Sequence, residues 1–203
     1  MRTQENRRKI VKFTELAILT AIVFVLQAVG IAIKLPFLAT PVSLVLIPIV
    51  LGAIVLGPKA GAWLGFVFGL EVFIMCGVMA LDPFTTILTQ EHPIITFLLC
   101  VTKSTLAGFL SGLIYKALKK LNPWARTVIA AIIAPVVNTA VFIIGCLFMY
   151  NTLESNFVQE GSTVLYFLII GCAGLNFIVE LLINVVFAPV LSKLTMILNK
   201  RLI

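Results

Sequence analysis

Long apolar runs, interrupted by short clusters of proline, glycine and charged residues, make up most of the chain. A helix needs about 20 mostly apolar residues to cross a bilayer, and five of the six runs reach that length. The other run, at residues 42–56, is shorter and contains Pro48. The six predicted spanning segments are residues 13–33, 42–56, 60–80, 94–115, 127–150 and 163–191. The pattern therefore predicts an all-α membrane protein with six transmembrane helices, which form a single domain over residues 1–203.

The interruptions predict where the segments end. Lys34, Pro36 and Pro41 close the first segment, because proline cannot continue a helix cleanly. The sequence Gly57-Pro58-Lys59 predicts a tight turn between the second and third segments. Polar residues at 81–92 and 151–162 are interpreted as loops, and residues 116–126 form a basic turn.

Composition agrees with a membrane protein and excludes a water-soluble globule. Of the 203 residues, 61% are apolar and 11% are charged, against about 45–50% and about 25% in average soluble domains. The mean hydropathy is +1.17. Six spans leave no room for an extramembrane domain. The basic start MRTQENRRKIVK resembles the opening of a secretory signal. It lacks a small-residue cleavage site and precedes a run that is long enough to span, so we expect it to be retained.

The net charge of +7 is explained by topology. In the predicted arrangement, 13 of the 15 Lys and Arg residues fall on one side of the membrane. They lie in residues 1–12, at Lys59, in residues 116–126 and in residues 193–201. The opposite loops hold Lys34 together with acidic side chains. Because Lys and Arg are retained in the cytoplasm, both termini are predicted to be cytoplasmic. This distribution also argues against a nucleic-acid partner.

The sequence offers little for catalysis or for a metal centre. The four cysteines lie inside apolar runs without metal-ligand spacing and are interpreted as packing residues. The single histidine, His92, falls in a predicted outer loop, so neither a multi-histidine metal site nor a Ser-His-Asp arrangement can form inside the membrane. No G-x-x-x-x-G-K-[ST] motif occurs. We therefore expect no enzyme, no cofactor and no ATP hydrolysis by this chain, so powered transport would need a partner or an ion gradient.

Three ionisable residues fall at membrane depth: Glu71, Lys103 and Glu180. Such groups are costly in a bilayer and therefore mark candidate functional sites. Lys103 lies about 15 Å from the outer end of its segment, where it could meet an anionic ligand or pair with a carboxylate. For Glu71 the structural interpretation, an ion pair with Lys103, is the favoured one.

Intramembrane amides add to this set. Asn176, Glu180 and Asn184 are spaced at i, i+4 and i+8, which stacks them along one helix face. Asn138 lies in the fifth segment shortly after Pro135. Such amides can bind a ligand, or they can link helices by hydrogen bonds. The candidate substrate-binding residues are therefore Lys103, Asn138, Asn176, Glu180, Asn184 and Glu71.

Small residues indicate close helix contacts in two places. Gly52, Gly57, Gly61, Gly65 and Gly69 recur at or near four-residue spacing, which allows close helix packing. In the first segment, Ala17 and Ala21 form an A-x-x-x-A pair that could dock another helix, in this chain or in a partner.

The IPIVLGAIVLGPKAGAWLGFVFGL stretch and the Ala17/Ala21 pair, on six short spans, resemble the substrate-binding S-component of an energy-coupling factor (ECF) vitamin transporter. The resemblance covers nearly the whole chain. It implies a bacterial plasma-membrane protein that captures a vitamin from outside and releases it inside when the bundle topples. It also implies that Ala17 and Ala21 dock on a T-component, which two ABC ATPase subunits drive.

The ligand is predicted less sharply than the architecture. The second and third segments are most similar to pantothenate-type members, and Lys103 would supply a charge that matches this anion. Riboflavin or a pyridoxine- or pyrimidine-type vitamin would instead use aromatic stacking and amide hydrogen bonds. A stand-alone transporter in which Glu71 or Glu180 carries a proton is a separate alternative, and a purely structural membrane protein is a third.

Overall fold

The computed structural model describes residues 2–32, 43–158 and 161–202. It is 88% helix, and the described residues form no strand. Within these residues, five helical stretches are long and apolar enough to cross a membrane: Gln4–Ala32, Pro58–Val78, Pro93–Ala117, Pro123–Leu147 and Val164–Ile197. The prediction of an all-α membrane protein is confirmed. The predicted second span contains the shorter apolar helix α2 (Leu46–Val55), which at about 1.5 Å per residue covers about half a bilayer.

Three single α-helices and two composite helices make up these five stretches. The single helices are α1 (Arg2–Ala32), α5 (Pro93–Ala117) and α6 (Pro123–Leu147). Helix α3 (Pro58–Val72) continues into the π-helix η1 (Phe73–Val78). Short α8 (Val164–Tyr166) and the π-helix η2 (Phe167–Gly174) lead into α9 (Leu175–Leu202). The helix expected to end at residue 191 thus continues to Leu202.

The two regions predicted as loops contain short helices, α4 (Pro83–Glu91) and α7 (Tyr150–Phe157). Helix α4 has a strong start signal that the loop interpretation overlooked. Asp82 caps it by accepting a hydrogen bond from the backbone of Thr85, and Pro83 occupies the first turn. Lys34, Pro36 and Pro41, expected to close the first segment, lie outside the described residues, as does Glu160.

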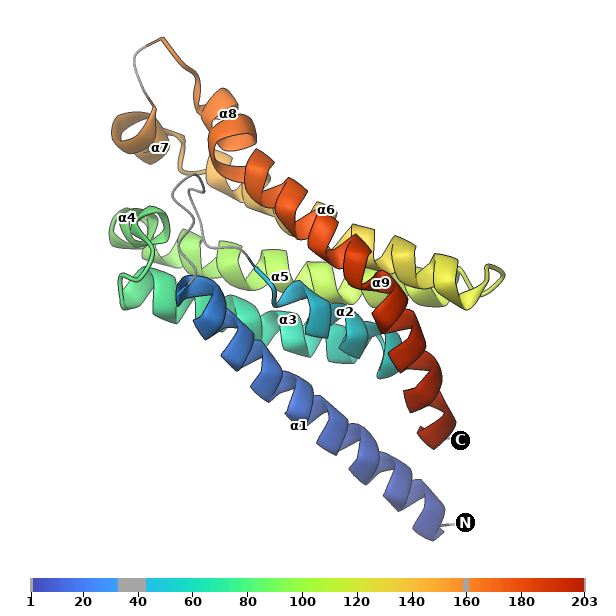
Figure 1. Ribbon diagram of the computed structural model, residues 1–203. Coiled ribbons are helices and arrows are strands. Elements are labelled where there is room, and N and C mark those ends of the chain that lie inside the picture. Colours follow the sequence, from blue (N-terminus) through green and yellow to red (C-terminus); the bar gives the residue numbers. More distant parts are fainter. Residues whose placement is uncertain (1, 33–42, 159–160, 203) are drawn as a thin grey trace.

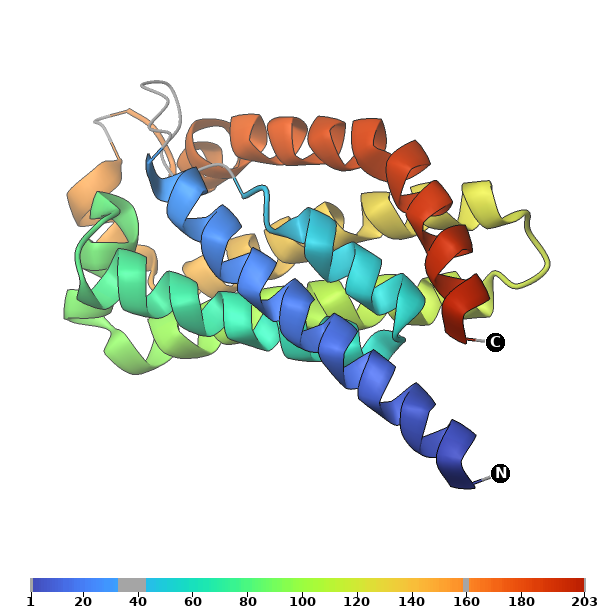
Figure 2. The same ribbon diagram turned by 60° about the horizontal axis from the view of Figure 1, so that its bottom comes forward.

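Both termini and the turn between α5 and α6 lie at one end of the bundle, and α4 and α7 lie at the other (Figure 1). The view from a second direction shows the same arrangement (Figure 2). We call the end with α4 and α7 the outer end, following the predicted topology. The figures place the two termini together, whereas which compartment they face stays a prediction.

Glycines bring α3 directly onto the backbone of α5. A Cβ atom added to Gly61, Gly65 or Gly69 would collide with the backbone carbonyl of Gly108, Ser104 or Cys100, respectively. Gly52 behaves differently, because its added Cβ would meet the side chain of Leu64. The predicted close packing is therefore present, and its main partner is α5.

Candidate functional site

A cavity of about 80 Å³ lies between the helices towards the outer end. This volume holds a few water molecules, so a larger ligand must displace lining side chains. Phe68, Phe84, Phe142 and Phe177 contribute aromatic rings to the lining. Its polar and charged members are Gln27, Ser43, Asp82, Thr85, Thr96, Lys103, Asn138, Thr139, Asn176 and Glu180. Four of the six predicted substrate-binding residues are thus brought together.

Lys103 enters the cavity from α5. Its Nζ atom lies 5.0 Å from the ring centroid of Phe142 on α6, a cation–π distance. Within the described residues, no carboxylate oxygen lies within 4.0 Å of this amine. The expected ion pair between Lys103 and Glu71 is therefore wrong, and Lys103 is available to the cavity.

Glu180 lies at the cavity wall near donor groups from two other segments. These are the backbone N–H of Ser43 and the side chain of Asn138, both of which act on its carboxylate. Glu180 is only 4% exposed and Asn138 only 7%. Among the described residues, the Oδ1 atom of Asn138 has no hydrogen-bond partner. This part of the wall therefore presents acceptor atoms.

Asp82 and Gln27 also line the cavity, although their positions in the sequence gave little sign of it. Asp82, 3% exposed, accepts two hydrogen bonds from Thr85 at its Oδ2 atom, from the backbone N–H at 2.9 Å and from Oγ1 at 2.6 Å. Gln27 on α1 lies with its Nε2 atom 4.0 Å from the sulfur of Cys76. The D-P-x-T capping pattern could have located Asp82 at a helix start, whereas nothing in the local sequence shows that the helix end is buried.

Two predicted site residues lie elsewhere. Glu71 is 4% exposed and is not among the residues that line the cavity. It falls on the α3 face that carries Leu64 and Phe68, which pack in a cluster with α1 and α2. Asn184 is fully buried, and its Nδ2 donates to the backbone oxygen of Glu180 at 2.9 Å. Asn176, one turn before Glu180, does line the cavity.

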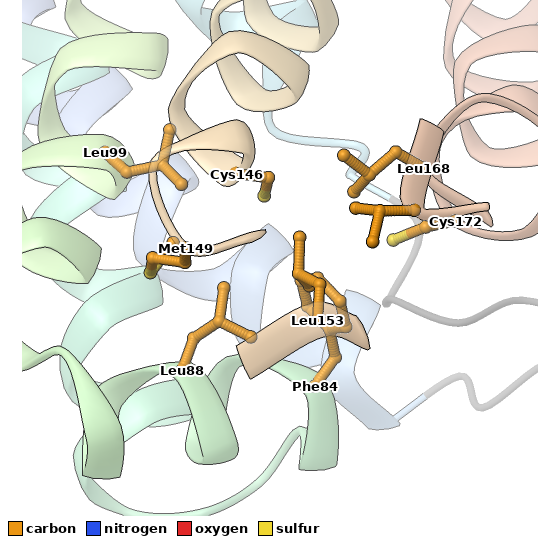
Figure 3. Packing of buried hydrophobic residues seen from close by; sticks show 9 residues of the cluster. Phe84, Leu88, Leu99, Cys146, Met149, Leu153, Leu168 and Cys172 are labelled. Carbon is orange, nitrogen blue, oxygen red and sulfur yellow. The ribbon is translucent and has the colours of Figure 1, made fainter. Parts of the chain in front are cut away.

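An apolar cluster closes the outer end of the cavity. Phe84 and Leu88 of α4 meet Leu153 of α7, together with side chains from α5, α6 and η2 (Figure 3). The rings of Phe84 and Phe157 lie 5.0 Å apart, measured between centroids. Because Phe84 and Leu88 also line the cavity, α4 forms part of its outer cover.

A polar contact at the surface joins the same two short helices. The carboxylate of Glu91, at the end of α4, accepts hydrogen bonds from Thr152 Oγ1 and from Asn156 Nδ2 on α7, the second at 3.0 Å. These hydrogen bonds stabilise the carboxylate and lower the pKa of Glu91 below its ordinary value.

Two π-helical segments border the cavity. Cys76 from η1 and Cys172 and Ala173 from η2 are among its lining residues. A π-helix inside an α-helix is rare and is frequent at functional sites. All four cysteines are free and buried, and no group of three His, Cys, Asp or Glu side chains in the described chain could hold a metal ion.

The predicted docking residues lie on a different surface. Ala17 and Ala21 are exposed on α1, away from the cavity. Leu19 and Val23, between and beyond them, are buried and attach α1 to α2 and α3. Helix α1 thus presents small side chains outward from a face that the bundle does not cover.

Comparison with models of known protein families identifies a family for this chain. The model of the family described as "ECF transporter, substrate-specific component" matches residues 11–192. No curated protein sequence matches the chain.

Proposed function

Because the chain belongs to the family of substrate-specific components of ECF transporters, we propose that it binds a small water-soluble vitamin from outside and delivers it to the cytoplasm. The family consists of transporter subunits, not of enzymes. The observation that carries the proposal is the cavity: an apolar bundle places Lys103, Asn138 and Glu180 around one shared space. Polar side chains at such a depth are costly, and a polar ligand gives a reason for them.

The direct test is to identify what the protein holds. The protein is purified in detergent, and native mass spectrometry measures the mass of any retained small molecule. We expect one vitamin-sized compound per chain, released on denaturation. If no compound is retained, equilibrium dialysis with a panel of radiolabelled vitamins provides the second measurement. No retention and no binding would overturn the proposal.

Two ligand classes follow from the sequence and the site. Pantothenate, an anion, is supported by the resemblance of the second and third segments and by Lys103, which has no carboxylate within 4.0 Å among the described residues. Riboflavin or a pyridoxine- or pyrimidine-type vitamin is supported by the aromatic rings and amides in the lining.

We further propose that energy comes from partner subunits. Members of this family work with an ECF T-component and ATPases, and the P-loop motif is absent from this sequence. The exposed Ala17 and Ala21 on α1 are the proposed contact with the T-component, since small side chains let two helices approach closely. Two ABC ATPase subunits complete the proposed complex.

The docking role is tested by changing side-chain size. Ala17→Arg and Ala21→Arg should prevent copurification with the T-component and ATPases, and should leave binding of the retained compound intact. Ala17→Ser and Ala21→Ser keep the side chains small and serve as matched controls that should still assemble. Equal loss of assembly and of ligand binding in the Arg variants would count against docking.

A stand-alone proton-coupled transporter is the second candidate function. It is favoured by Glu71, a buried carboxylate whose Oε2 atom has no hydrogen-bond partner among the described residues. Proteoliposomes that contain this chain alone separate the two candidates. The ECF proposal expects binding without accumulation, whereas accumulation driven by a proton gradient would establish the second.

We also propose six spans in a bacterial plasma membrane with both termini in the cytoplasm. The four native cysteines are buried, so exposed positions can be labelled selectively. Replacing Ser155 or Lys119, both exposed at opposite ends of the bundle, with Cys gives two reporters. A membrane-impermeant maleimide applied to intact cells should label Ser155→Cys and spare Lys119→Cys, and the reverse result would invert the topology.

A further inference from the structure

Three segments converge at the part of the cavity wall that holds Glu180. The backbone N–H of Ser43, just before α2, and the side chain of Asn138 on α6 both lie near its carboxylate. The carboxylate is buried and has four lone-pair sites, more than these two donors could occupy.

Acceptors exceed donors in this part of the wall. Asn138 directs its amide N–H towards Glu180, and its Oδ1 atom is buried without a partner in the described part of the chain. A buried acceptor without a donor is unfavourable. A ligand that brings N–H or O–H groups would satisfy both Glu180 and Asn138 Oδ1.

Lys103 adds a positive charge to the same cavity. Its amine lies over the ring of Phe142, which follows Asn138 by four residues on α6, and its charge also acts on the carboxylate of Glu180. Four residues advance an α-helix by about 6 Å, so Phe142 lies about one helical turn from Asn138. Helix α6 runs towards the outer end, so Phe142 is nearer the outside than Asn138.

The charges of the described lining do not favour an anion. Lys103 is its single cation, whereas Asp82 and Glu180 are both acidic. One cation and two acidic side chains give the described lining a formal charge of −1. An anionic ligand would increase this excess of negative charge, and a neutral or cationic ligand would not.

We infer that the substrate is a neutral or cationic ring compound with at least two neighbouring N–H or O–H donors, which face Glu180 and Asn138, while an acceptor faces Lys103. Phe84, Phe142 and Phe177 provide apolar surfaces for the ring. An amino-substituted nitrogen heterocycle has this chemistry. The inference rests on the proposed function and selects between its two ligand classes.

The test compares two compounds on the purified full chain by equilibrium dialysis: 4-amino-5-hydroxymethyl-2-methylpyrimidine and pantothenate. We expect the aminopyrimidine to bind at least about tenfold more tightly, which corresponds to one hydrogen bond to a charged group. Glu180→Gln puts a donor where the ligand needs an acceptor and should weaken aminopyrimidine binding about tenfold or more. Glu71→Gln makes the same change at a buried carboxylate outside the cavity and should leave binding unchanged.

Two results would overturn the inference and leave the proposed function standing. One is tighter binding of pantothenate than of the aminopyrimidine. The other is an effect of Glu180→Gln no larger than that of Glu71→Gln. If Glu180→Gln fails to fold, the comparison of the two compounds on the unaltered chain still tests the inference.

If neither compound binds, the mass and charge of the retained molecule test the inference. A neutral or cationic compound with neighbouring donors supports the inference, and an anionic compound overturns it. A chain that retains nothing and binds nothing overturns the proposed function, and the inference falls with it.

Discussion

Two adjoining sides of α5 meet their surroundings in different ways. On one side, Cys100, Ser104 and Gly108 lie against the three glycines of α3, so closely that an added Cβ would collide with a backbone carbonyl. On the adjoining side, Thr96 and Lys103 border the cavity, and Cys100 belongs to both sides. A bilayer provides little hydrophobic driving force between helices, so association depends on close contact. The comparison shows that a helix packed tightly on one side can carry polar groups on the side next to it.

The largest effect is expected from opening the tight side. In Gly65→Ala the new Cβ collides with the backbone of Ser104 and Thr105, which cannot rotate away. We expect a loss of about 3 kcal/mol in the free energy of unfolding, at the upper end for overpacking. Thermal unfolding in detergent measures the change.

Gly171→Ala is the control for this prediction. Its new Cβ would meet only the ring of Phe167, at 3.2 Å, and a side chain can shift. We expect its free energy of unfolding to change by less than about 1 kcal/mol. Equal destabilisation of the two variants would show that the contact between α3 and α5 tolerates separation.

The next effect concerns the open side, at Lys103. Lys103→Met keeps an unbranched side chain that is one atom shorter and removes its charge. For a ligand that presents an anion to the amine, such as pantothenate, binding should weaken by about 1.5–3 kcal/mol. Binding constants from equilibrium dialysis measure this. Stable protein with unchanged pantothenate affinity would remove Lys103 from the proposed anion contact.

A smaller effect is expected where α5 joins the outer cover. Thr96 Oγ1 donates to the backbone oxygen of Leu88 on α4 at 2.9 Å, in a buried environment. Thr96→Val keeps the shape of the side chain and removes the donor, which should cost about 1 kcal/mol of unfolding free energy. Thr102→Val, at an exposed position on the same helix, is the control and should unfold like the unaltered chain.

The smallest effect is a pH dependence at the outer surface. Hydrogen bonds lower the pKa of Glu91 below the ordinary value of 4.5. The stabilisation is therefore complete above that pH and is lost as the pH falls through the lowered pKa. Amide hydrogen exchange in α7 should become faster in this acidic range. Glu91→Gln should exchange faster at neutral pH and lose the acid-dependent step, and an unchanged step would exclude Glu91 as its origin.

Much of the fold could be predicted because the thickness of the bilayer sets the length of apolar sequence that a spanning helix needs. Five of the six expected segments correspond to helices long enough to span. The short helices α4 and α7 were missed because their many polar residues suggested loops, although Asp82 and Pro83 form a clear helix start. Hydropathy alone does not distinguish a polar loop from a short helix that covers an end of the bundle.

The site could be predicted in part. The cost of burying polar groups in a bilayer identified Lys103, Asn138, Asn176 and Glu180, and all four line the cavity. The same reasoning could not show that Glu71 lies outside the cavity, because a carboxylate can be buried either in a cavity or in an interface between helices. Helices α3 and α5 do pack together, but which side of each helix a residue occupies relative to that contact is a tertiary fact, and the single sequence carries no signal for it. The pairing of Lys103 with Glu71 failed because the two side chains lie on different sides of the contact.

The π-helical segments η1 and η2 have a consequence for how such a cavity can change. Each turn of a π-helix holds about one residue more than a turn of an α-helix. Deleting one residue from Phe167–Gly174 would restore α-helical winding and rotate the outer part of that helix by about 100° relative to α9. Cys172 would then turn away from the cavity, and another side chain of the same helix would line the cavity in its place. Insertion or deletion of a single residue in a helix could thus change which ligand the cavity binds, without any substitution of the residues that line it.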